Sequence, residues 1–351
     1  MSIVNKNQDT IGPIKEDLEQ DLQQDFKKTF SKVKVLFMGT PEFALPGFQA
    51  LINEPSFEII GAYTQNDKPV GRKQELNETP VKKLAREFNI PVFQPLKIKT
   101  EVENIKNLQP NLIVVIAYGK IVPQEILDIP KYGCINVHAS LLPKYRGSSC
   151  LSAPILNGDT ETGITIMKME AGLDTGPILK QEKIGLSGKE NLSDVHDALS
   201  NLGGKILVET LKLWIEGKIE AKKQKDELST YVSITKKEDG KLDFSKDALE
   251  LERKIRAYNP WPGTYAFLDD KTLKIIEAEV KTRDNKIEDK IGIEAKNLLK
   301  IGEIYEENGK ILVNCGQNYL DILKLQLPGK KALNIKEFLN GNKDLIGKVL
   351  K

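Results

Sequence analysis

Asn136, His138 and Asp174 are the residues of this sequence best suited to carry chemistry. His138 is one of only two histidines, and it follows the apolar run Cys134–Val137, which is typical of a buried strand. Asn136 lies two residues before His138, so a strand would place both side chains on one face. An amide donor beside a group that exchanges protons near neutral pH suits the attack of an amine on a carbonyl carbon.

Asp174 supplies a carboxylate for this pair, between the two glycines of Gly172-Leu-Asp-Thr-Gly176. Glycines on both sides let a loop approach a ligand closely. Asp174 could hold the imidazole, raise the pKa of His138 or relay a proton through water. Each residue also has a structural alternative: a hydrogen-bonded histidine at a strand end, an aspartate that forms a turn, and an asparagine that satisfies local backbone groups. Residue type and spacing alone therefore give a hypothesis of a carbonyl site.

The segments around these residues predict an α/β domain. Apolar runs typical of strands alternate with helical patterns, which favours a doubly wound, mostly parallel, Rossmann-like sheet. The expected strands are 33–38, 57–63, 112–117, 134–137, 163–169 and 178–184, and the expected helices are 41–52, 79–89, 123–127, 153–156 and 193–216. Ligands of open α/β sheets bind beyond the carboxyl ends of the strands, which is where His138 would lie.

The length of 351 residues favours two domains. We expect a polar N-terminal extension over 1–31, a catalytic domain over 32–216, a polar and basic linker over 217–230, and a second domain over 231–351. Short strand-like runs separated by turn residues in the last region predict a small antiparallel barrel, like the oligonucleotide-binding (OB) fold. These runs are 264–268, 273–280, 310–314 and 319–327, with helices at 249–258 and 335–339.

Composition argues against several classes of protein. There are 52 basic and 50 acidic residues, so a nucleic-acid partner would need a local basic face. Three widely spaced cysteines without a Cys-x-x-Cys pair argue against a disulfide framework or a structural zinc site. No apolar run approaches the ~18 residues of a membrane span, and the polar, acidic N-terminus resembles no signal peptide. We expect a cytoplasmic monomer with no membrane partner.

Several motifs occur in an order that resembles the folate-dependent formyltransferases. They are Asn136-Val-His-Ala-Ser-Leu-Leu-Pro143, Arg146-Gly147, Gly158-Asp-x-Glu-Thr-Gly163 and Gly172-Leu-Asp-Thr-Gly176. Three further motifs narrow the resemblance to the family members that act on methionyl-tRNA: Phe37-Met-Gly-Thr-Pro-Glu-Phe43, Asn259-Pro-Trp-Pro262 and Pro328-Gly-Lys-Lys331. The resemblance runs from about Val33 to the C-terminus.

The resemblance implies transfer of a formyl group from 10-formyltetrahydrofolate to the α-amine of methionine on initiator tRNA, for translation initiation. It implies that Asn136 binds the formyl oxygen as negative charge develops, and that His138 orients and assists proton transfer. Asp174 would support His138 and help to deprotonate the amine. The segment that matches the folate site comprises Ser140, Leu141, Leu142 and Pro143. No metal is implied, because two isolated histidines make a poor ligand set.

The resemblance also implies contacts with tRNA. The polar loop 65–73 matches a loop that enters the acceptor region, and Arg72 matches an arginine that can contact phosphate and stack on a base. The sequence departs from the family just afterwards, at 73–75, where more glycine and lysine are usual. The other candidate tRNA contacts are Lys73, Arg146, Lys222, Lys223, Lys330 and Lys331. Each of these charges could equally belong to a solvated face.

Some alternatives stay open. Cys150 and Ser152 stand where relatives carry proline and glutamine, so Cys150 is either a reactive thiol or a small buried residue. The same catalytic residues could formylate an amino-sugar nucleotide or glycinamide ribonucleotide, or hydrolyse formyl-folate with water as the acceptor. A tRNA-binding protein without activity is an alternative of another class. The joint presence of the three polar residues and the folate segment argues against it.

Overall fold

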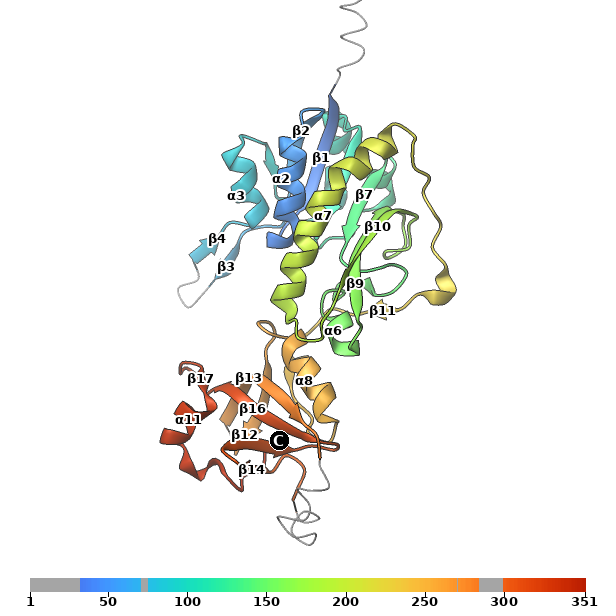
Figure 1. The fold of residues 1–351 in the computed structure, drawn as a ribbon. Coiled ribbons are helices and arrows are strands. Elements are labelled where there is room, and N and C mark those ends of the chain that lie inside the picture. Colours follow the sequence, from blue (N-terminus) through green and yellow to red (C-terminus); the bar gives the residue numbers. More distant parts are fainter. Residues whose placement is uncertain (1–31, 71–74, 270, 284–298) are drawn as a thin grey trace, which may run out of the picture.

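The computed structural model describes residues 32–70, 75–269, 271–283 and 299–351, which form two domains in succession (Figure 1). The expected extension over 1–31 lies outside these residues. Within the described part of the chain, no helix combines the length and the apolar character needed to cross a membrane.

A seven-stranded sheet forms the first domain, in the order β10-β9-β7-β6-β1-β2-β5. The strands are β1 (Val33–Gly39), β2 (Phe57–Tyr63), β5 (Val92–Phe93), β6 (Leu112–Ile116), β7 (Cys134–His138), β9 (Glu161–Lys168) and β10 (Ile178–Gly185). All neighbours from β7 to β5 are parallel, whereas β9 is antiparallel to both β7 and β10. The predicted, mostly parallel sheet is therefore confirmed. Only β9, next to the edge strand β10, runs in the opposite direction to the other strands of this sheet.

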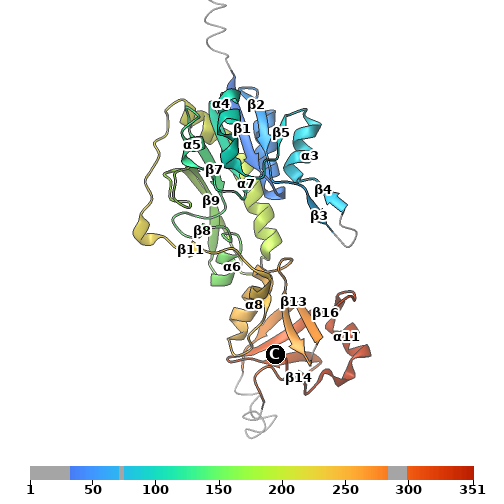
Figure 2. The same ribbon diagram turned by 180° about the vertical axis from the view of Figure 1, so that it is seen from behind.

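Helices cover both faces of this sheet (Figures 1 and 2). One face carries α2 (Leu45–Asn53), α3 (Pro80–Glu87) and α7 (Leu192–Ile215), and the other carries α4 (Val102–Leu108) and α5 (Gln124–Leu127). Both faces of the sheet are covered because both carry apolar side chains. In β1, Val35 and Phe37 belong to one apolar core, whereas Leu36 and Met38 belong to the other. Two separate cores confirm the doubly wound prediction.

The second domain is an antiparallel sheet in the order β12-β13-β16-β15-β14, with β17 paired to β16. Its strands are β12 (Thr264–Leu268), β13 (Lys271–Lys281), β14 (Ile304–Glu307), β15 (Lys310–Asn314), β16 (Tyr319–Gln326) and β17 (Leu333–Asn334), with helices α8 (Ala248–Ala257) and α11 (Ile335–Gly341). The end of the chain links the two outer strands, because Leu350 pairs with Leu268 and Val349 pairs with Glu303. These pairs close the sheet on itself.

The expected linker 217–230 does not run freely between the domains. After α7 it returns along the first domain to β11 (Tyr231–Val232), which pairs in parallel with β8 (Arg146–Gly147) (Figure 1). On the way, Lys222 and Ile178 exchange two backbone hydrogen bonds of 2.8 and 2.7 Å. This return segment, 217–232, is therefore bonded to the first domain over much of its length, where the sequence led us to expect a linker.

Candidate active site

The polar residues predicted to act together lie at the carboxyl end of β7. Asn136 and His138 are on the strand itself, and Asp174 lies in the loop that joins β9 to β10. The Nδ1 atom of His138 is 3.7 Å from Oδ2 of Asp174, just beyond hydrogen-bond distance. The structure therefore brings the imidazole and the carboxylate side by side, although 36 residues separate them in the sequence.

His138 is 6% exposed, and its Nε2 atom lies 3.0 Å from the carbonyl oxygen of Tyr145. Because a carbonyl only accepts, Nε2 carries the proton and the neutral ring turns the lone pair of Nδ1 toward Asp174. Burial lowers the pKa of His138 below its ordinary value, and the nearby charge of Asp174 opposes that shift only in part. The imidazole is therefore neutral at pH 7.

Asp174 is held at both its side chain and its backbone. Its Oδ2 atom accepts a 2.8 Å hydrogen bond from the backbone N–H of Gly147, and its carbonyl accepts one of 2.8 Å from Gln224. The backbone of Asp174 adopts φ +52°, a left-handed conformation that is uncommon for residues other than glycine. A Cβ at Gly176 would clash with the carbonyl oxygen of Lys168, so the loop needs glycine there.

Asn136 is half-buried, and its side chain makes no hydrogen bond to any other residue that the structure describes. A free amide donor next to a buried, neutral imidazole is available to an external oxygen. The arrangement can stabilise an oxygen that gains negative charge while the neighbouring groups accept or relay a proton.

The segment expected to line the folate site is tied to Thr165, which pairs with His138 across β7 and β9. Thr165 donates a 2.6 Å hydrogen bond to the carbonyl of Ser140 and accepts one of 3.1 Å from the N–H of Leu142. Ser140 and Leu142 are buried, whereas Leu141 and Pro143 keep exposed surface. Only the latter two side chains have surface to offer a ligand.

Arg146 corrects an expectation. It is 2% exposed, and its guanidinium donates to Gln224, Asp226 and the hydroxyl of Tyr231 at 2.7 to 3.1 Å. A phosphate could reach these donors only after the bonds were broken. These bonds argue against the expected tRNA contact at Arg146, and they fix the return segment to β8.

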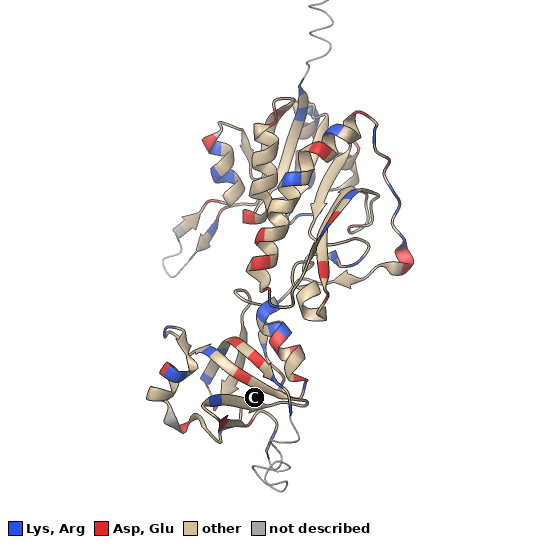
Figure 3. Cartoon of the chain, viewed as in Figure 1, with Lys and Arg blue, Asp and Glu red and all other residues tan. Residues whose placement is uncertain are grey.

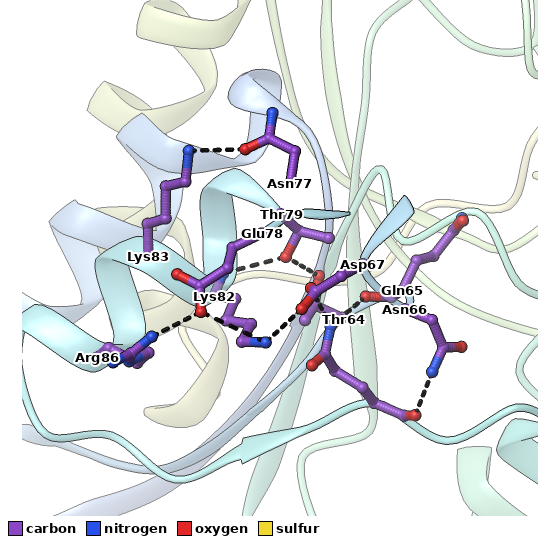
Figure 4. Close-up of polar contacts among 11 residues, drawn as sticks. Thr64, Gln65, Asn66, Asp67, Asn77, Glu78, Thr79, Lys82, Lys83 and Arg86 are labelled. Carbon is purple, nitrogen blue, oxygen red and sulfur yellow. Dashed lines mark hydrogen bonds and ion pairs between the residues drawn. The ribbon is translucent and has the colours of Figure 1, made fainter. Parts of the chain in front are cut away.

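The expected tRNA loop coincides with a hairpin of β3 (Lys68–Val70) and β4 (Glu75–Asn77), and its residues Arg72 and Lys73 lie outside the described residues. A polar network holds the base of this hairpin (Figure 4). Lys82 of α3 pairs with Asp67 at 2.5 Å and with Glu78 at 3.5 Å, and Gln94 donates to Asp67 at 2.8 Å. The lysine lowers the pKa of the Asp67 carboxyl, so the pair stays charged.

The remaining lysines expected to contact tRNA are exposed and, within the described ranges, have no ion-pair partner. Lys222 and Lys223 lie on the return segment, beside β10 at one edge of the large sheet. Lys330 and Lys331 precede β17, and this strand lies on the side of the molecule that also carries the β3–β4 hairpin (Figures 1 and 3). The two pairs therefore do not form one continuous stripe.

Sequence reasoning missed the supports of the site: the N–H of Gly147, the hydroxyl of Thr165 and the amide of Gln224. No local pattern marks them, because each acts through a contact made in the folded chain. Cys150 is 8% exposed and burial raises its pKa to about 12, so it is a small buried residue and not a reactive thiol. Among the described residues, no group of three or more His, Cys, Asp or Glu side chains could hold a metal ion.

Comparison with known proteins adds independent evidence. Residues 31–211 match the family model described as formyl transferase, and 234–343 match that of the formyl transferase C-terminal domain. A methionyl-tRNA formyltransferase of Geobacter sulfurreducens is 46% identical over 311 residues, covering 88% of this chain and 94% of the relative. That of Clostridium perfringens strain 13 is 41% identical over 322 residues, covering 91% of this chain and all of the relative.

Solved structures show the same fold at lower identity. The N-formyltransferase of Helicobacter canadensis, in complex with folinic acid and dTDP-3-aminofucose, is 20% identical with a TM-score of 0.60, over 83% of this chain and 98% of that one. The sugar 3N-formyl transferase WlaRD, solved with dTDP and 5-N-formyl-THF, is 21% identical with a TM-score of 0.59, over 85% and 99% of the two chains.

Proposed function

The chain belongs to the formyl transferase family, and we propose that it transfers a formyl group from 10-formyltetrahydrofolate to the α-amine of initiator methionyl-tRNA. The choice of acceptor rests on relatives that are named for methionyl-tRNA and match almost their whole length. The two formyltransferase structures solved with dTDP or dTDP-3-aminofucose are only about one-fifth identical to this chain, so they carry no argument for a sugar acceptor.

The free amide of Asn136 beside the neutral His138 is the observation that carries this proposal. The amine nitrogen of methionine attacks the formyl carbon, and the new C–N bond forms while the carbonyl oxygen gains negative charge. Asn136 donates a hydrogen bond to that oxygen. The bond between the formyl carbon and N10 of the folate then breaks, and N10 takes up a proton as tetrahydrofolate leaves.

Two groups divide the proton transfer. Burial keeps His138 neutral, so the lone pair of Nδ1 can accept a proton near pH 7. The carboxylate of Asp174, 3.7 Å from that atom, stabilises the imidazolium that would form and can reach the amine through one water. Both groups lie at the one strand end that also presents Asn136.

The folate supplies the formyl carbon, and the exposed surfaces of Leu141 and Pro143 would contact it beside β7. The residues present suit such a molecule, because a free amide donor for the formyl oxygen lies next to this partly apolar segment. We also propose that the protein is a monomer and that it acts in the cytoplasm. The proposal also assigns the closed C-terminal sheet to the OB-like class and gives it a second contact with tRNA through Lys330 and Lys331.

A transfer assay with radiolabelled formyl donor tests the proposal. We expect label on initiator methionyl-tRNA, and none on glycinamide ribonucleotide or a dTDP-amino sugar. Uncharged initiator tRNA is the control, because it lacks the amine. Label on a sugar nucleotide without label on methionyl-tRNA would overturn the proposal, as would release of free formate with every acceptor.

A further inference from the structure

Gln224, a buried glutamine of the return segment 217–232, forms the physical connection between that segment and the candidate catalytic loop. Its side chain is 6% exposed, in a stretch where the flanking Lys223 and Lys225 are exposed. In an extended chain neighbouring side chains point to opposite sides, so Gln224 can face inward while Lys223 and Lys225 face the solvent. The inward side chain therefore has a structural partner that the polar sequence around it does not reveal.

All four hydrogen-bonding positions of this amide are used. Its Oε1 atom accepts from Nε and Nη2 of Arg146 at 3.1 and 2.8 Å. Its Nε2 atom donates to the carbonyls of Asp174 and Gly176 at 2.8 and 2.7 Å. Because an arginine can only donate and a carbonyl can only accept, these partners fix which end of the amide is oxygen.

The hydrogen bonds from Gln224 to the carbonyls of Asp174 and Gly176 restrain the loop at and beside its left-handed residue. Asp174 has φ +52°, and its carboxylate position depends on this conformation. The N–H of Gly147, next to Arg146, binds the same carboxylate at 2.8 Å. Arg146 thus joins two restraints: its own guanidinium orients Gln224, and the following residue holds Oδ2 of Asp174.

We propose that Gln224 is a positioning residue for the reaction, which sets the place of the Asp174 carboxylate relative to His138 without touching the substrate. The inference rests on the proposed function, because it takes Asp174 as an active-site carboxylate. It also gives the return segment a role other than joining two domains. Removal of the two bonds to the loop carbonyls would let Asp174 leave its strained conformation, and the distance of 3.7 Å to His138 would no longer be maintained.

Gln224→Glu is the sharpest test. The variant keeps the shape of the side chain and an acceptor for Arg146, but replaces the two donors to the loop with an oxygen that repels carbonyls. We expect kcat to fall about 10- to 100-fold, the range for a misplaced catalytic group. The KM for methionyl-tRNA should change less than about twofold, because substrate binding is not touched. Gln109→Glu, at an exposed site before the amino end of β6, is the matched control and should leave kcat unchanged.

A double-mutant cycle separates positioning from general damage. If Gln224 acts through the carboxylate, Gln224→Glu should cost less than about twofold when added to Asp174→Asn, because neighbours that share one function are not additive. A merely structural defect would reduce both backgrounds equally. An unchanged kcat in folded Gln224→Glu, or a full penalty in the Asp174→Asn background, would overturn the inference.

Arg146→Lys keeps the test decisive if Gln224→Glu does not fold. It retains a cation beside Asp226 but loses the two-pronged grip on Gln224, so the same loss of kcat and the same non-additivity are expected. Full activity of Arg146→Lys would contradict the inference. The wild-type assay with methionyl-tRNA is run first. Its failure would remove the proposed function, whereas an active wild type with normal variants would remove only the role of Gln224.

Discussion

The carboxyl end of β7 and the exposed lysine sites present polar groups in opposite ways. At the strand end, His138 and Asp174 are largely buried and each has defined partners. The lysines at 222–223 and 330–331 are exposed, and none forms an ion pair with a described residue. A buried group depends on one geometry, whereas an exposed charge acts at a distance and through salt-sensitive attraction. Substitutions at the end of β7 should therefore reduce activity sharply, whereas the loss of exposed lysines should reduce function by small steps.

Asp174→Asn should give the largest effect. It keeps the shape of the side chain and its contact with Gly147, but removes the charge beside His138, so kcat should fall about 10²- to 10⁴-fold. The melting temperature should stay close to that of the wild type, which calorimetry can check. Asp197→Asn, at an exposed carboxylate on α7, is the matched control. Near-normal turnover in Asp174→Asn would show that this residue has no part in the mechanism. The end of β7 would then respond to substitution no more sharply than the exposed lysines.

Asn136→Ala should come next. Removal of a donor that binds a developing oxyanion costs about 10²- to 10³-fold in kcat. The side chain has no hydrogen-bond partner among the described residues, so the free energy of unfolding should change little. Steady-state rates and urea unfolding together measure this split. A destabilised variant with a normal kcat would instead give Asn136 a structural role.

The double variant Lys330→Ala/Lys331→Ala should give a smaller, graded effect. We expect the KM for methionyl-tRNA to rise a few-fold at constant kcat, because each exposed charge contributes about 1 kcal/mol or less. The slope of log KM against log salt should become shallower by up to about one for each phosphate that the variant no longer binds. Lys131→Ala/Lys205→Ala, two exposed lysines of the first domain, is the control. If the dependence of KM on salt concentration did not change, Lys330 and Lys331 would not be part of the surface that binds tRNA.

The smallest effect is expected in the pH dependence of the wild type. Burial lowers the pKa of His138, so the wild type should show no loss of kcat/KM at pH 7 and a loss only below the ordinary histidine value of about 6.5. The unfolded chain binds this proton at higher pH than the folded chain does. The free energy of unfolding should therefore decrease as the pH falls through that range, and His138→Gln should weaken this dependence. An NMR titration that places the pKa of His138 above 6.5 would contradict the prediction.

The sequence predicted most of the fold because its strands are continuous apolar runs. Phe57–Tyr63 and Lys310–Asn314 match the predicted strands at both ends. The short β3–β4 hairpin and the two-residue pair of β8 and β11 were missed, because strands of two or three residues are too short to show a period. Family resemblance, more than spacing, joined Asn136, His138 and Asp174.

Arg146 shows why the rest of the site could not be predicted. After Pro-Lys-Tyr it reads as a surface charge, yet its burial depends on Gln224, 78 residues further along the chain. The N–H of Gly147 is equally invisible, since any residue has one. Roles assigned by long-range contacts and backbone groups need the folded chain, whereas roles assigned by side-chain type at a strand end do not.

The course of α7 has a consequence for the number of residues that follow it. The hydroxyl of Ser200 bonds to Phe43, beyond the carboxyl end of β1, and the indole of Trp214 bonds to Tyr132, before the amino end of β7. The chain leaves α7 near the amino ends of the strands, whereas Asp174 lies near the carboxyl end of β7. The few residues between α7 and Gln224 must therefore bring the chain back to Asp174. An ordinary linker tolerates an added glycine. Here a single insertion between Gly217 and Ile219 would move Lys223 into the place of Gln224, next to the loop that carries Asp174. The length of this segment is thus under tighter constraint than its composition.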